Sequence, residues 1–477
     1  APRGARRGRT PAVVDVGAPH ASVWWATLQD QPAARAPLDG DLDVDVAIVG
    51  AGFTGLWTAK ALLDHDPTMR VAVLEATVAG AGASGRNGGW ASALYPLSFA
   101  RVRSLSGDDQ MRSLRRALRE GVTSIADEAA ASGIEFDYQR GGTVTLARTE
   151  LQASQLQAEL DEATSLGDGP DDLQWLDAEA ASARCAASDV VGGLYTPHCA
   201  AVHPAKLVTG LAAVVEQLGG SIYEGTPVTA IEPGDRWRRA RAVTASGTVR
   251  ADVVVRATEG FTPSLASARR AVVPLYSLVV ATDRLDVSFF ERIGLGDRET
   301  FNDARHLIIY GQRTADDRVV LGGRGAPYHF GSRVDARFDD VPSVFDKLEA
   351  TLHELFGDVP GRVAFRWGGP LAMARDQAPS VRFDADSGMA SAGGYVGDGV
   401  VLSRIAAHAL ADLITGVDSA LTRLPFVGHR ARDWEPEPLR WLGINGGLMA
   451  ASIADRREAA TGRASMAATV LARLQGH

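Results

Sequence analysis

A short glycine motif, GAGFTG at residues 50–55, has the spacing of a backbone that must come close to a phosphate. In a GxGxxG pattern the first glycine makes the turn, the second admits a pyrophosphate and the third lets a helix pack closely on a strand. Glu75 follows about 20 residues after Gly55, where a carboxylate would bind the hydroxyl pair of a ribose. Together they predict an adenine dinucleotide site rather than a turn without a ligand. The candidate contacts from these segments are Gly50, Gly52, Phe53, Thr54, Gly55 and Glu75.

A second bare loop, GASGRNGG at residues 82–89, directly follows the expected ribose-binding strand. A nicotinamide enzyme would usually continue here with alternating strands and helices, whereas a bare loop can run along the rest of an extended FAD. Ser84 can offer a hydroxyl to a phosphate, and Arg86 and Asn87 can donate towards the polar edge of the flavin or place a substrate. We therefore expect FAD as the cofactor; the alternative is an exposed turn whose Arg and Asn face water. The expected cofactor contacts are Ala83, Ser84, Arg86, Asn87, Gly88 and Gly89, and Arg86 and Asn87 are also catalytic candidates.

The elements that must hold these loops follow from hydrophobic periodicity. A strand over 43–50, a helix over 54–64 and a strand over 71–76 form a β-α-β unit around the first motif. Strands at 272–283, 306–313 and 318–325, separated by turn residues, predict one antiparallel sheet. Further helices are expected over 107–131, 149–165, 203–220, 342–356 and 400–415.

The alternation of these segments predicts an α/β fold with α+β elements, in which the chain crosses several times between two domains. A Rossmann-like FAD-binding domain is interleaved with a substrate domain that is built on a mixed, largely antiparallel sheet. We expect the FAD-binding domain over 41–100, 200–270 and 365–420, and the substrate domain over 101–199 and 271–364. Residues 1–40 are expected to form an N-terminal tail, basic over 1–20, with a docking segment, and residues 421–477 a C-terminal helical extension.

Composition argues against several other classes of protein. The chain has 477 residues and a net charge of −9, which argues against general binding to nucleic acid or to an anionic membrane. No run of about 18 apolar residues predicts a membrane span. Cys185 and Cys199 match no disulfide framework or zinc pattern, so a reducing, cytoplasmic location is expected. The histidines are scattered, so no metal site is expected, and Ser84 lies outside any GxSxG motif of a hydrolase.

Beyond these motifs, most of residues 40–450 resemble the D-amino acid oxidase superfamily of flavoenzymes. DVAIVGAGFTGLWTA, the GASGRNGG loop, HPAKLVTGLA, TPV before VVVRAT, LGGR and GGYVGDGVVLSRIAAHALADL follow one another in the expected order. The GASGRNGG form and PLRWLGINGGL at 438–448 are most similar to its gamma-glutamylputrescine oxidase branch. The resemblance implies an FAD in an extended pose and an antiparallel sheet over the face of the flavin.

The resemblance also implies further cofactor contacts. Val228 would hold the adenine through its backbone, and Thr258 ends the strand that contains VVVRAT. The GDGV loop precedes a helix whose N-terminus would stabilise negative charge on the reduced flavin. The contacts expected from this loop are Gly397, Asp398, Gly399 and Val400.

Three positions depart from the family pattern. Many members have His in place of Asp398, and we expect this carboxylate to cap the following helix by binding a backbone amide. Glu259 stands where relatives often have the Asn of ATNA, and a solvated loop residue is expected there. Leu371 occupies the place of the Arg that clamps the substrate carboxylate in α-amino-acid oxidases, and leucine cannot make that bidentate pair. An amine is therefore the better-supported substrate, unless another strand supplies the clamp from Arg313, Arg324 or Arg366.

Amine oxidation needs an unprotonated amine whose carbon is held beside the flavin, and a desolvated aromatic pocket favours the neutral amine. Tyr276 and Tyr310, on strands expected to cover the flavin, are the catalytic candidates from the sheet. Trp90 and Tyr395 are further candidate walls. The three lysines of the chain fall on predicted helices, so none is expected over the flavin to assist oxygen.

The sequence thus predicts an FAD-dependent oxidoreductase that removes a hydride from the carbon next to an amine nitrogen. The imine would hydrolyse to an aldehyde or ketone plus amine or ammonia, and O2, giving H2O2, or another electron acceptor would reoxidise the flavin. The first alternative is an oxidase or dehydrogenase of amino acids or N-methyl amino acids. A flavin monooxygenase would need a second nucleotide motif, and a non-catalytic FAD-binding protein is the last alternative. The expected partners are a small-molecule amine and the electron acceptor, with no nucleic acid and no membrane.

Overall fold

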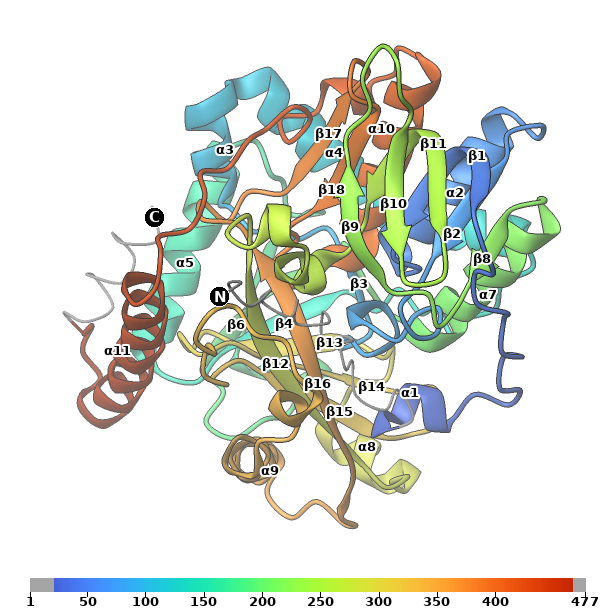
Figure 1. The fold of residues 1–477 in the computed structure, drawn as a ribbon. Coiled ribbons are helices and arrows are strands. Elements are labelled where there is room, and N and C mark those ends of the chain that lie inside the picture. The colour runs from blue at the N-terminus through green and yellow to red at the C-terminus, as the bar shows by residue number, and fades with distance from the viewer. Residues whose placement is uncertain (1–20, 466–477) are drawn as a thin grey trace, which may run out of the picture.

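The computed structural model describes residues 21–465. In Figure 1 the first large sheet lies with its helices in the upper right of the view, and the second large sheet lies below it. The predicted basic tail over 1–20 and the last part of the predicted C-terminal extension, 466–477, lie outside the described residues.

The first sheet consists of β1 (Leu42–Val49), β2 (Val71–Leu74), β8 (Ser221–Tyr223), β9 (Val228–Glu232), β10 (Ala240–Thr244), β11 (Thr248–Arg256), β17 (Ser380–Asp384) and β18 (Met389–Gly393). Its path is β17-β18-β11-β1-β2-β8, with β10 beside β11 and β9 beside β10. The pairs β18–β11, β11–β1, β1–β2 and β2–β8 are parallel. The antiparallel pairs β17–β18, β10–β11 and β9–β10 complete a Rossmann-like sheet, as predicted.

The second sheet consists of β4 (Thr143–Ala147), β5 (Gln174–Asp177), β6 (Gly192–Thr196), β12 (Val273–Thr282), β13 (Thr300–Asp303), β14 (Ile309–Arg313), β15 (Val319–Gly323) and β16 (Val363–Met373). Its order is β16-β12-β15-β14-β13-β4-β6-β5. Neighbouring strands are antiparallel except β13 and β4, which are parallel. The prediction of a mixed, largely antiparallel sheet is confirmed, and the three strands predicted to share it are β12, β14 and β15.

A short antiparallel ribbon, β3 (Trp90–Ser92) with β7 (Cys199–Ala201), directly follows the GASGRNGG loop. The helices are α1 (Val23–Ala26), α2 (Phe53–His65), α3 (Phe99–Ser106), α4 (Asp108–Ala131), α5 (Glu150–Ser165), α6 (Ala178–Arg184), α7 (Pro204–Gln217), α8 (Val287–Ile293), α9 (Pro342–Phe356), α10 (Gly399–Thr415) and α11 (Leu439–Thr461). Short 3₁₀ helices are η2 (Ala83–Gly85), η3 (Glu259–Ser264), η4 (Ala266–Ala268), η5 (Ala336–Asp339) and η6 (Leu421–Arg423). None of the helices within 21–465 is long and apolar enough to cross a membrane.

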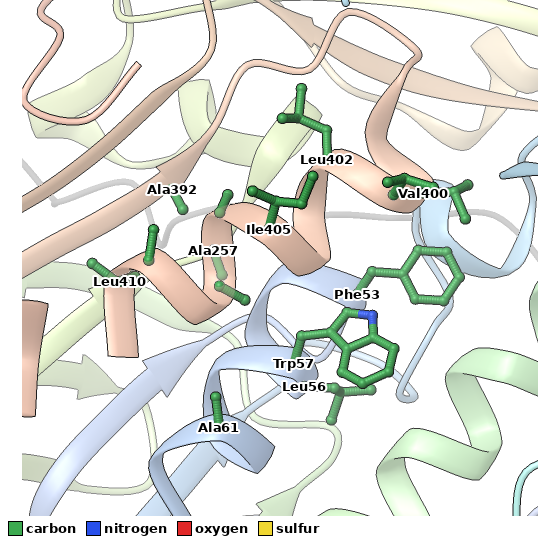
Figure 2. Close-up of a cluster of buried hydrophobic side chains, with 14 of the residues drawn as sticks. Phe53, Leu56, Trp57, Ala61, Ala257, Ala392, Val400, Leu402, Ile405 and Leu410 are labelled. Carbon is green, nitrogen blue, oxygen red and sulfur yellow. The ribbon is translucent and has the colours of Figure 1, made fainter. Parts of the chain in front are cut away.

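Helix α2 is apolar on almost every side because it lies between the first sheet and helices α7 and α10. Figure 2 shows Phe53 and Trp57 of α2 beside Val400 and Ile405 of α10. The two helices begin at the two glycine loops, residues 50–55 and 397–400. Packing α2 against α10 therefore places both loops on one side of the core.

Two segments pack differently from the expected domain boundaries. β16 pairs with β12 along its length, although residues from 365 were expected in the FAD-binding domain. Pro370 is tolerated in β16 because this strand lies at the edge of the sheet. Helix α4, expected in the substrate domain, buries Leu114, Leu118 and Val122 in one core with α2 and α10. Periodicity predicts that a helix has an apolar face but not which partner covers it.

Candidate cofactor and substrate site

Two glycines of the first motif have no room for a side chain. Gly50 has φ +106°, and a Cβ on it would lie 2.5 Å from the carbonyl oxygen of Ala257. A Cβ on Gly55 would lie 2.0 Å from the carbonyl oxygen of Gly50. The chain can therefore turn sharply after β1, and α2 begins close beside that strand with its N-terminus at the carboxyl end of the sheet.

Glu75 follows β2, and backbone amides hold its carboxylate in place. Oε2 accepts a hydrogen bond from the amide of Ala51 at 2.9 Å, and Oε1 accepts one from the amide of Thr77 at 3.0 Å. Burial raises the pKa of Glu75, although these two hydrogen bonds act in the opposite direction. A carboxylate fixed beside the motif in this way is suited to accept hydrogen bonds from ribose hydroxyls.

The GASGRNGG loop is shaped by its own side chains. Ser84 Oγ accepts from the amide of Phe53 at 2.8 Å, which leaves the hydroxyl hydrogen to donate to a phosphate. Asn87 Nδ2 donates to the carbonyl oxygen of Ser84 at 2.9 Å, and its Oδ1 accepts from the amide of Gly89 at 2.8 Å. Asn87 was predicted as a catalytic candidate; its side-chain contacts within the protein hold the loop.

Gln312 of β14 also holds this loop and was missed by sequence reasoning. Its Nε2 donates to the carbonyl oxygens of Gly88 at 2.6 Å and Gly89 at 2.9 Å, and the side chain is completely buried. A Cβ on Gly89 would lie 2.0 Å from this Nε2, so the glycine is needed for the contact. A lone glutamine in a strand gives no sequence signal for such a role.

A cavity that opens to solvent lies between these two loops and β9, with about 1190 Å³ of empty space when its open mouth is included. The predicted cofactor residues that line it are Gly50, Gly52, Phe53, Thr54, Glu75, Ala83, Ser84, Asn87, Val228, Thr258, Gly397, Gly399 and Val400. Of the other predicted contacts, Gly55 acts through helix packing and Gly89 packs against Gln312. Arg86, Gly88 and Asp398 line the neighbouring cavity instead.

The cavity fits FAD. A Cβ on Gly52 would lie 2.9 Å from Ser84 Oγ, so the backbone here is bare where a pyrophosphate would approach. Amides of the motif and Ser84 would hold the phosphates, Glu75 the ribose, and the backbone at Val228 the adenine. FAD, when bound, supplies the two-electron acceptor of the reaction.

A second cavity adjoins the first and shares part of its lining, with about 1630 Å³ of empty space when its open mouth is included. The shared residues are Ala83, Asn87, Leu371, Gly397 and Val400. Its other walls come from β3, β12 and β14, so the second sheet covers the place where the cavities meet. A molecule in the second cavity would therefore contact a ligand bound at the adjoining end of the first cavity.

Arg86 lines the second cavity and is almost completely buried. Its Nη1 donates to Asp339 Oδ2 at 2.6 Å. Its Nε and Nη2 are buried and have no hydrogen-bond partner among the described residues. A guanidinium with two unsatisfied donors at a cavity wall is suited to bind an oxygen atom of a ligand.

The structure separates the two tyrosines that the sequence predicted as catalytic. Tyr310 lines the second cavity, where its hydroxyl lies 2.9 Å from Ser277 Oγ and its ring meets Trp90 edge to face. Tyr276 does not line this cavity and packs against His329 on the other face of β12. The reason is strand alternation, because Ser277 and Val279 point into the cavity and residue 276 must point away. Tyr395 lines the first cavity only.

Leu371 lies where the two cavities meet, and Arg324 reaches the same place from the end of β15. A Cβ on Gly397 would lie 3.5 Å from Arg324 Nη2 and 3.6 Å from Leu371 Cδ1. Arg313 instead pairs with Asp317, and the exposed Arg366 pairs with Glu349. Of the three arginines considered as a replacement clamp, Arg324 is thus the one that lines the second cavity.

Asp398 is the N-cap residue of α10, but its side chain makes no capping hydrogen bond. The expected capping role is therefore wrong. Asp398 has φ −91° and ψ 33°, whereas a residue whose side chain caps a helix usually has an extended backbone. The residue lines the second cavity. Burial raises the pKa of its carboxyl group to about 6, although Arg324 acts in the opposite direction.

Glu259 is not the solvated loop residue that the sequence led us to expect. It lines the first cavity, and its carboxylate accepts from the amides of Gly394 at 2.8 Å and Tyr395 at 3.2 Å. Its backbone adopts a left-handed conformation, with φ 39°, which is costly for a residue with a side chain. Glu259 therefore ties the end of β11 to the loop before α10. In the sequence, only the glycine pair at 393–394 indicated that a side chain from another segment comes close to this loop.

The lysines lie on helices, as predicted. Lys60 on α2 pairs with Asp64, and Lys206 on α7 pairs with Asp137. Lys347 lies on α9, and none of the three lines either cavity. Within the described part of the chain, no group of three or more His, Cys, Asp and Glu side chains could hold a metal ion.

Comparisons with known proteins confirm the resemblance. The chain is 29% identical over 423 residues to gamma-glutamylputrescine oxidoreductase of Escherichia coli (strain K12), covering 86% of this chain and 94% of that protein. It is 25% identical over 395 residues to glycine oxidase of Geobacillus kaustophilus (strain HTA426), covering 80% and 96%. The crystal structure of glycine oxidase from Geobacillus kaustophilus shares the fold, with a TM-score of 0.69 at 22% identity, covering 82% of this chain and 100% of that one.

A model of the family described as FAD dependent oxidoreductase matches residues 45–413. The match includes the GAGFTG motif, the GASGRNGG loop, Leu371 and the 397–400 loop, and so every segment that lines the first cavity. The chain therefore belongs to the FAD dependent oxidoreductase family.

Proposed function

We propose that the protein oxidises an amine at the carbon next to its nitrogen and passes the electrons through FAD to O2. The observation that carries this proposal is the junction of the two cavities, where Leu371 and the 397–400 loop line both. A small molecule in the second cavity would meet the cofactor there. The resulting imine would hydrolyse in water to an aldehyde or ketone plus amine or ammonia.

The walls of the second cavity suit this chemistry. The rings of Tyr310 and Trp90 form an aromatic corner, and burial beside them disfavours a charged amine. The unsatisfied donors of Arg86 can bind an oxygen at the polar edge of the cofactor or on the substrate. Asn87 keeps the loop that carries Arg86 in shape. These residues orient the reactants, which is most of what such a reaction requires from a protein.

The apolar side chain of Leu371 at the junction supports an amine without an α-carboxylate as the substrate class. The similarity to a gamma-glutamylputrescine oxidoreductase supports the same class, because that relative is named for an amine. A γ-glutamylated or other N-substituted polyamine is therefore the first substrate to try.

Arg324 favours a second candidate function, the oxidation of amino acids or N-methyl amino acids. Its guanidinium ends against the same glycine as Leu371, so it could bind a carboxylate near the place of the family clamp. One of its nitrogens, Nη2, donates to the carbonyl oxygen of Val396 at 2.6 Å, which leaves the other donors for a ligand.

We further propose O2, giving H2O2, as the acceptor and the cytoplasm as the location. Arg86 and Arg324 are cations at the second cavity that could assist oxygen, since no lysine lines it. The two cysteines are buried and unpaired, which is compatible with a reducing compartment.

The test is anaerobic reduction of the purified yellow protein. We would add polyamines, γ-glutamylated amines, N-methylated amines and amino acids, and follow the absorbance of oxidised flavin. We expect amines to bleach the flavin, and air to restore it with one H2O2 formed for each O2 consumed. Bleaching by NADPH alone would instead indicate a monooxygenase, and a flavin that no amine or amino acid reduces would contradict the proposal.

The variant Arg324→Met separates the two substrate classes. If amino acids bleach the native protein and Arg324→Met abolishes only that activity, the second candidate is supported. Arg366→Met is the matched control, because Arg366 is exposed, pairs with Glu349 and lines neither cavity. We expect this control to behave like the native protein.

A further inference from the structure

Asp398 places a carboxyl group in the wall of the second cavity, next to its junction with the first. Its neighbours Gly397 and Gly399 line the first cavity, and Asp398 itself lines the second. The backbone amide of Asp398 donates to the carbonyl oxygen of Tyr395 at 3.0 Å, which fixes the turn before α10. Its carboxylate makes no hydrogen bond or ion pair with any residue in the described part of the chain. This carboxylate is therefore available to bind a ligand.

Arg324 and Cys199 interact electrostatically with Asp398, and further titratable groups lie on segments near it. Arg324 faces it from the end of β15, and its charge lowers the pKa of Asp398. Cys199 of β7 lies on another side, and the negative charge of Asp398 adds to the burial that raises the pKa of this thiol to about 11. Tyr95 lies in the segment after β3, where burial raises the pKa of its phenol. Behind the loop, Glu259 is held by two amides.

The other carboxylate, the histidine and the tyrosine Tyr310 that line the second cavity already have partners, whereas Arg86, Trp90 and Asn302 keep buried polar atoms without one within residues 21–465. Asp303, the second carboxylate among the lining residues, pairs with Arg305 at 2.6 Å. His306 Nε2 lies 3.0 Å from Glu458 of α11. The hydroxyl of Tyr310 is paired with Ser277. Among the described lining residues, Asp398 is therefore the anion left to meet a cationic ligand.

An amine reaches an enzyme at neutral pH mainly as an ammonium ion, because aliphatic ammonium groups have pKa values of about 10 in water. Its lone pair becomes available only after a proton leaves. Burial in the aromatic cavity lowers the pKa of the ammonium, whereas burial raises the pKa of Asp398 to about 6. The two values therefore approach each other, and proton transfer between the groups becomes less unfavourable than it is in water.

We propose that Asp398 binds the ammonium group of the substrate and accepts its proton, which makes it a catalytic residue of the amine oxidation put forward above. The N–H bond breaks, its electron pair stays on nitrogen, and the proton forms an O–H bond on the Asp398 carboxylate. The neutral amine is then ready to lose the hydride of its adjacent carbon. The proton on Asp398 returns to solvent water after the product leaves. This inference rests on the proposed function, but its binding step can be measured without turnover.

Binding of a fixed cation tests the first half of the proposal. Choline has a quaternary ammonium that cannot lose a proton, and 3,3-dimethyl-1-butanol is its uncharged carbon analogue. We would titrate both into the FAD-loaded protein by calorimetry, from pH 5 to pH 8. We expect choline to bind the native protein about tenfold more tightly at pH 8 than at pH 5, because a protonated Asp398 loses its charge, with no such trend for the alcohol.

Substitutions assign the effect to one side chain. Asp398→Asn should weaken choline binding about tenfold at pH 7.5 and remove its pH dependence, whereas Asp398→Glu should keep both. Asp386→Asn is the matched control, because this carboxylate lies on an exposed turn between β17 and β18. Choline binding that does not change with pH in the native protein, or that is equal in Asp398→Asn and native protein, would overturn the proposal even if one variant folded poorly.

Anaerobic stopped-flow reduction tests the second half, with the best amine from the substrate panel. In Asp398→Asn we expect a reduction rate at least tenfold lower at pH 7 that rises steadily towards alkaline pH, as solvent supplies more neutral amine. The native rate should level off at lower pH. Identical pH profiles would exclude Asp398 as the proton acceptor. If no amine reduces native protein that binds choline as expected, the proposed function fails while the cation site remains.

Discussion

Arg86 brings a positive charge into the wall of the second cavity, and Asp339 is the residue that compensates it. The Arg86 side chain is 3% exposed and that of Asp339 is 14% exposed, with Nη1 and Oδ2 2.6 Å apart. The partners come from segments far apart in the sequence, the GASGRNGG loop and η5. Removing one partner of a buried pair is strongly destabilising because the other charge stays buried without compensation.

We therefore expect Asp339→Ala to lower the free energy of unfolding by about 3 kcal/mol. Asp339→Asn should cost less, because its amide oxygen can still accept from Arg86. Urea unfolding at pH 7.5 would measure both values. Asp340→Ala is the matched control: the neighbouring carboxylate is exposed and should contribute little. Equal stability of the two alanine variants would show that the ion pair is not needed to hold Arg86.

At the scale of single residues, the sequence predicted the residues that line the first cavity better than the roles of those around the second. Gly50, Gly55 and Glu75 are tied to a motif whose spacing reflects backbone geometry, so their roles can be inferred from sequence alone. Asp398 and Glu259 depend on which loop lies opposite them, and that is decided by tertiary packing. Their departure from the family pattern was visible in the sequence, but its consequence was not.

At the scale of elements, one largely buried carboxylate joins three helices that share a hydrophobic core. Glu128 lies on α4, and its carboxylate pairs with Lys60 of α2 at 3.0 Å and with Arg404 of α10 at 2.6 Å. His408, one turn further along α10, lies 3.1 Å from the same carboxylate. Because α10 begins at the 397–400 loop, this cluster helps to fix the helix that carries Asp398.

Because of this cluster, the free energy of unfolding depends on pH in the acidic range. Burial alone would raise the pKa of Glu128, but its hydrogen bonds with His408 and Lys60 and the charges of His408 and Arg404 outweigh burial and lower the pKa to about 2. The unfolded value is about 4.3, so the stabilisation is fully present above that pH and is lost as pH falls towards 2. We expect Glu128→Gln to reduce the loss of unfolding free energy between pH 5 and pH 2 by up to about 3 kcal/mol.

The measurement is urea unfolding at several pH values in that range, on Glu128→Gln and on Glu120→Gln. Glu120 lies on an exposed face of the same helix and is the matched control. A Glu128→Gln profile parallel to that of Glu120→Gln would mean that the buried cluster does not couple the helices to pH.

The edge strand β16 shows where element prediction reached its limit. Its segment contains Gly368, Gly369 and Pro370, residues that are unfavourable inside a strand, yet it pairs with β12 over its length. Strand pairing is decided by a partner distant in the sequence, and an edge position removes the usual objection to proline. The strands β12, β14 and β15, by contrast, were predicted because their apolar runs are interrupted by clear turn residues.

At the scale of the whole molecule, the N-terminal docking segment, which contains α1, packs against the GASGRNGG loop. Trp24 of α1 is 2% exposed, and its Nε1 donates to the carbonyl oxygen of Asn87 at 2.8 Å. Its ring packs edge to face against Trp367 of β16 and His203 before α7. One side chain thus contacts the second sheet, the N-cap residue of α7 and the loop that lines both cavities.

Trp24→Ala should therefore affect stability and cofactor binding together. Deleting a buried Trp side chain typically lowers the free energy of unfolding by about 3–5 kcal/mol. The freed carbonyl of Asn87 would loosen the GASGRNGG loop, so we expect FAD to dissociate at least tenfold more readily. Trp24→Phe keeps most of the packing and removes the hydrogen bond, which should cost about 1 kcal/mol.

Urea unfolding and FAD retained after ultrafiltration would measure the two effects on the same samples. Trp237→Ala is the matched control, because Trp237 is 79% exposed in the turn between β9 and β10 and should change neither quantity. If Trp24→Ala lost stability but kept FAD as firmly as the control, the docking segment would support the core without holding the loop. A loss of both would mean that the first described helix of the chain helps to build the cofactor site, more than 60 residues away in sequence from the loop it contacts.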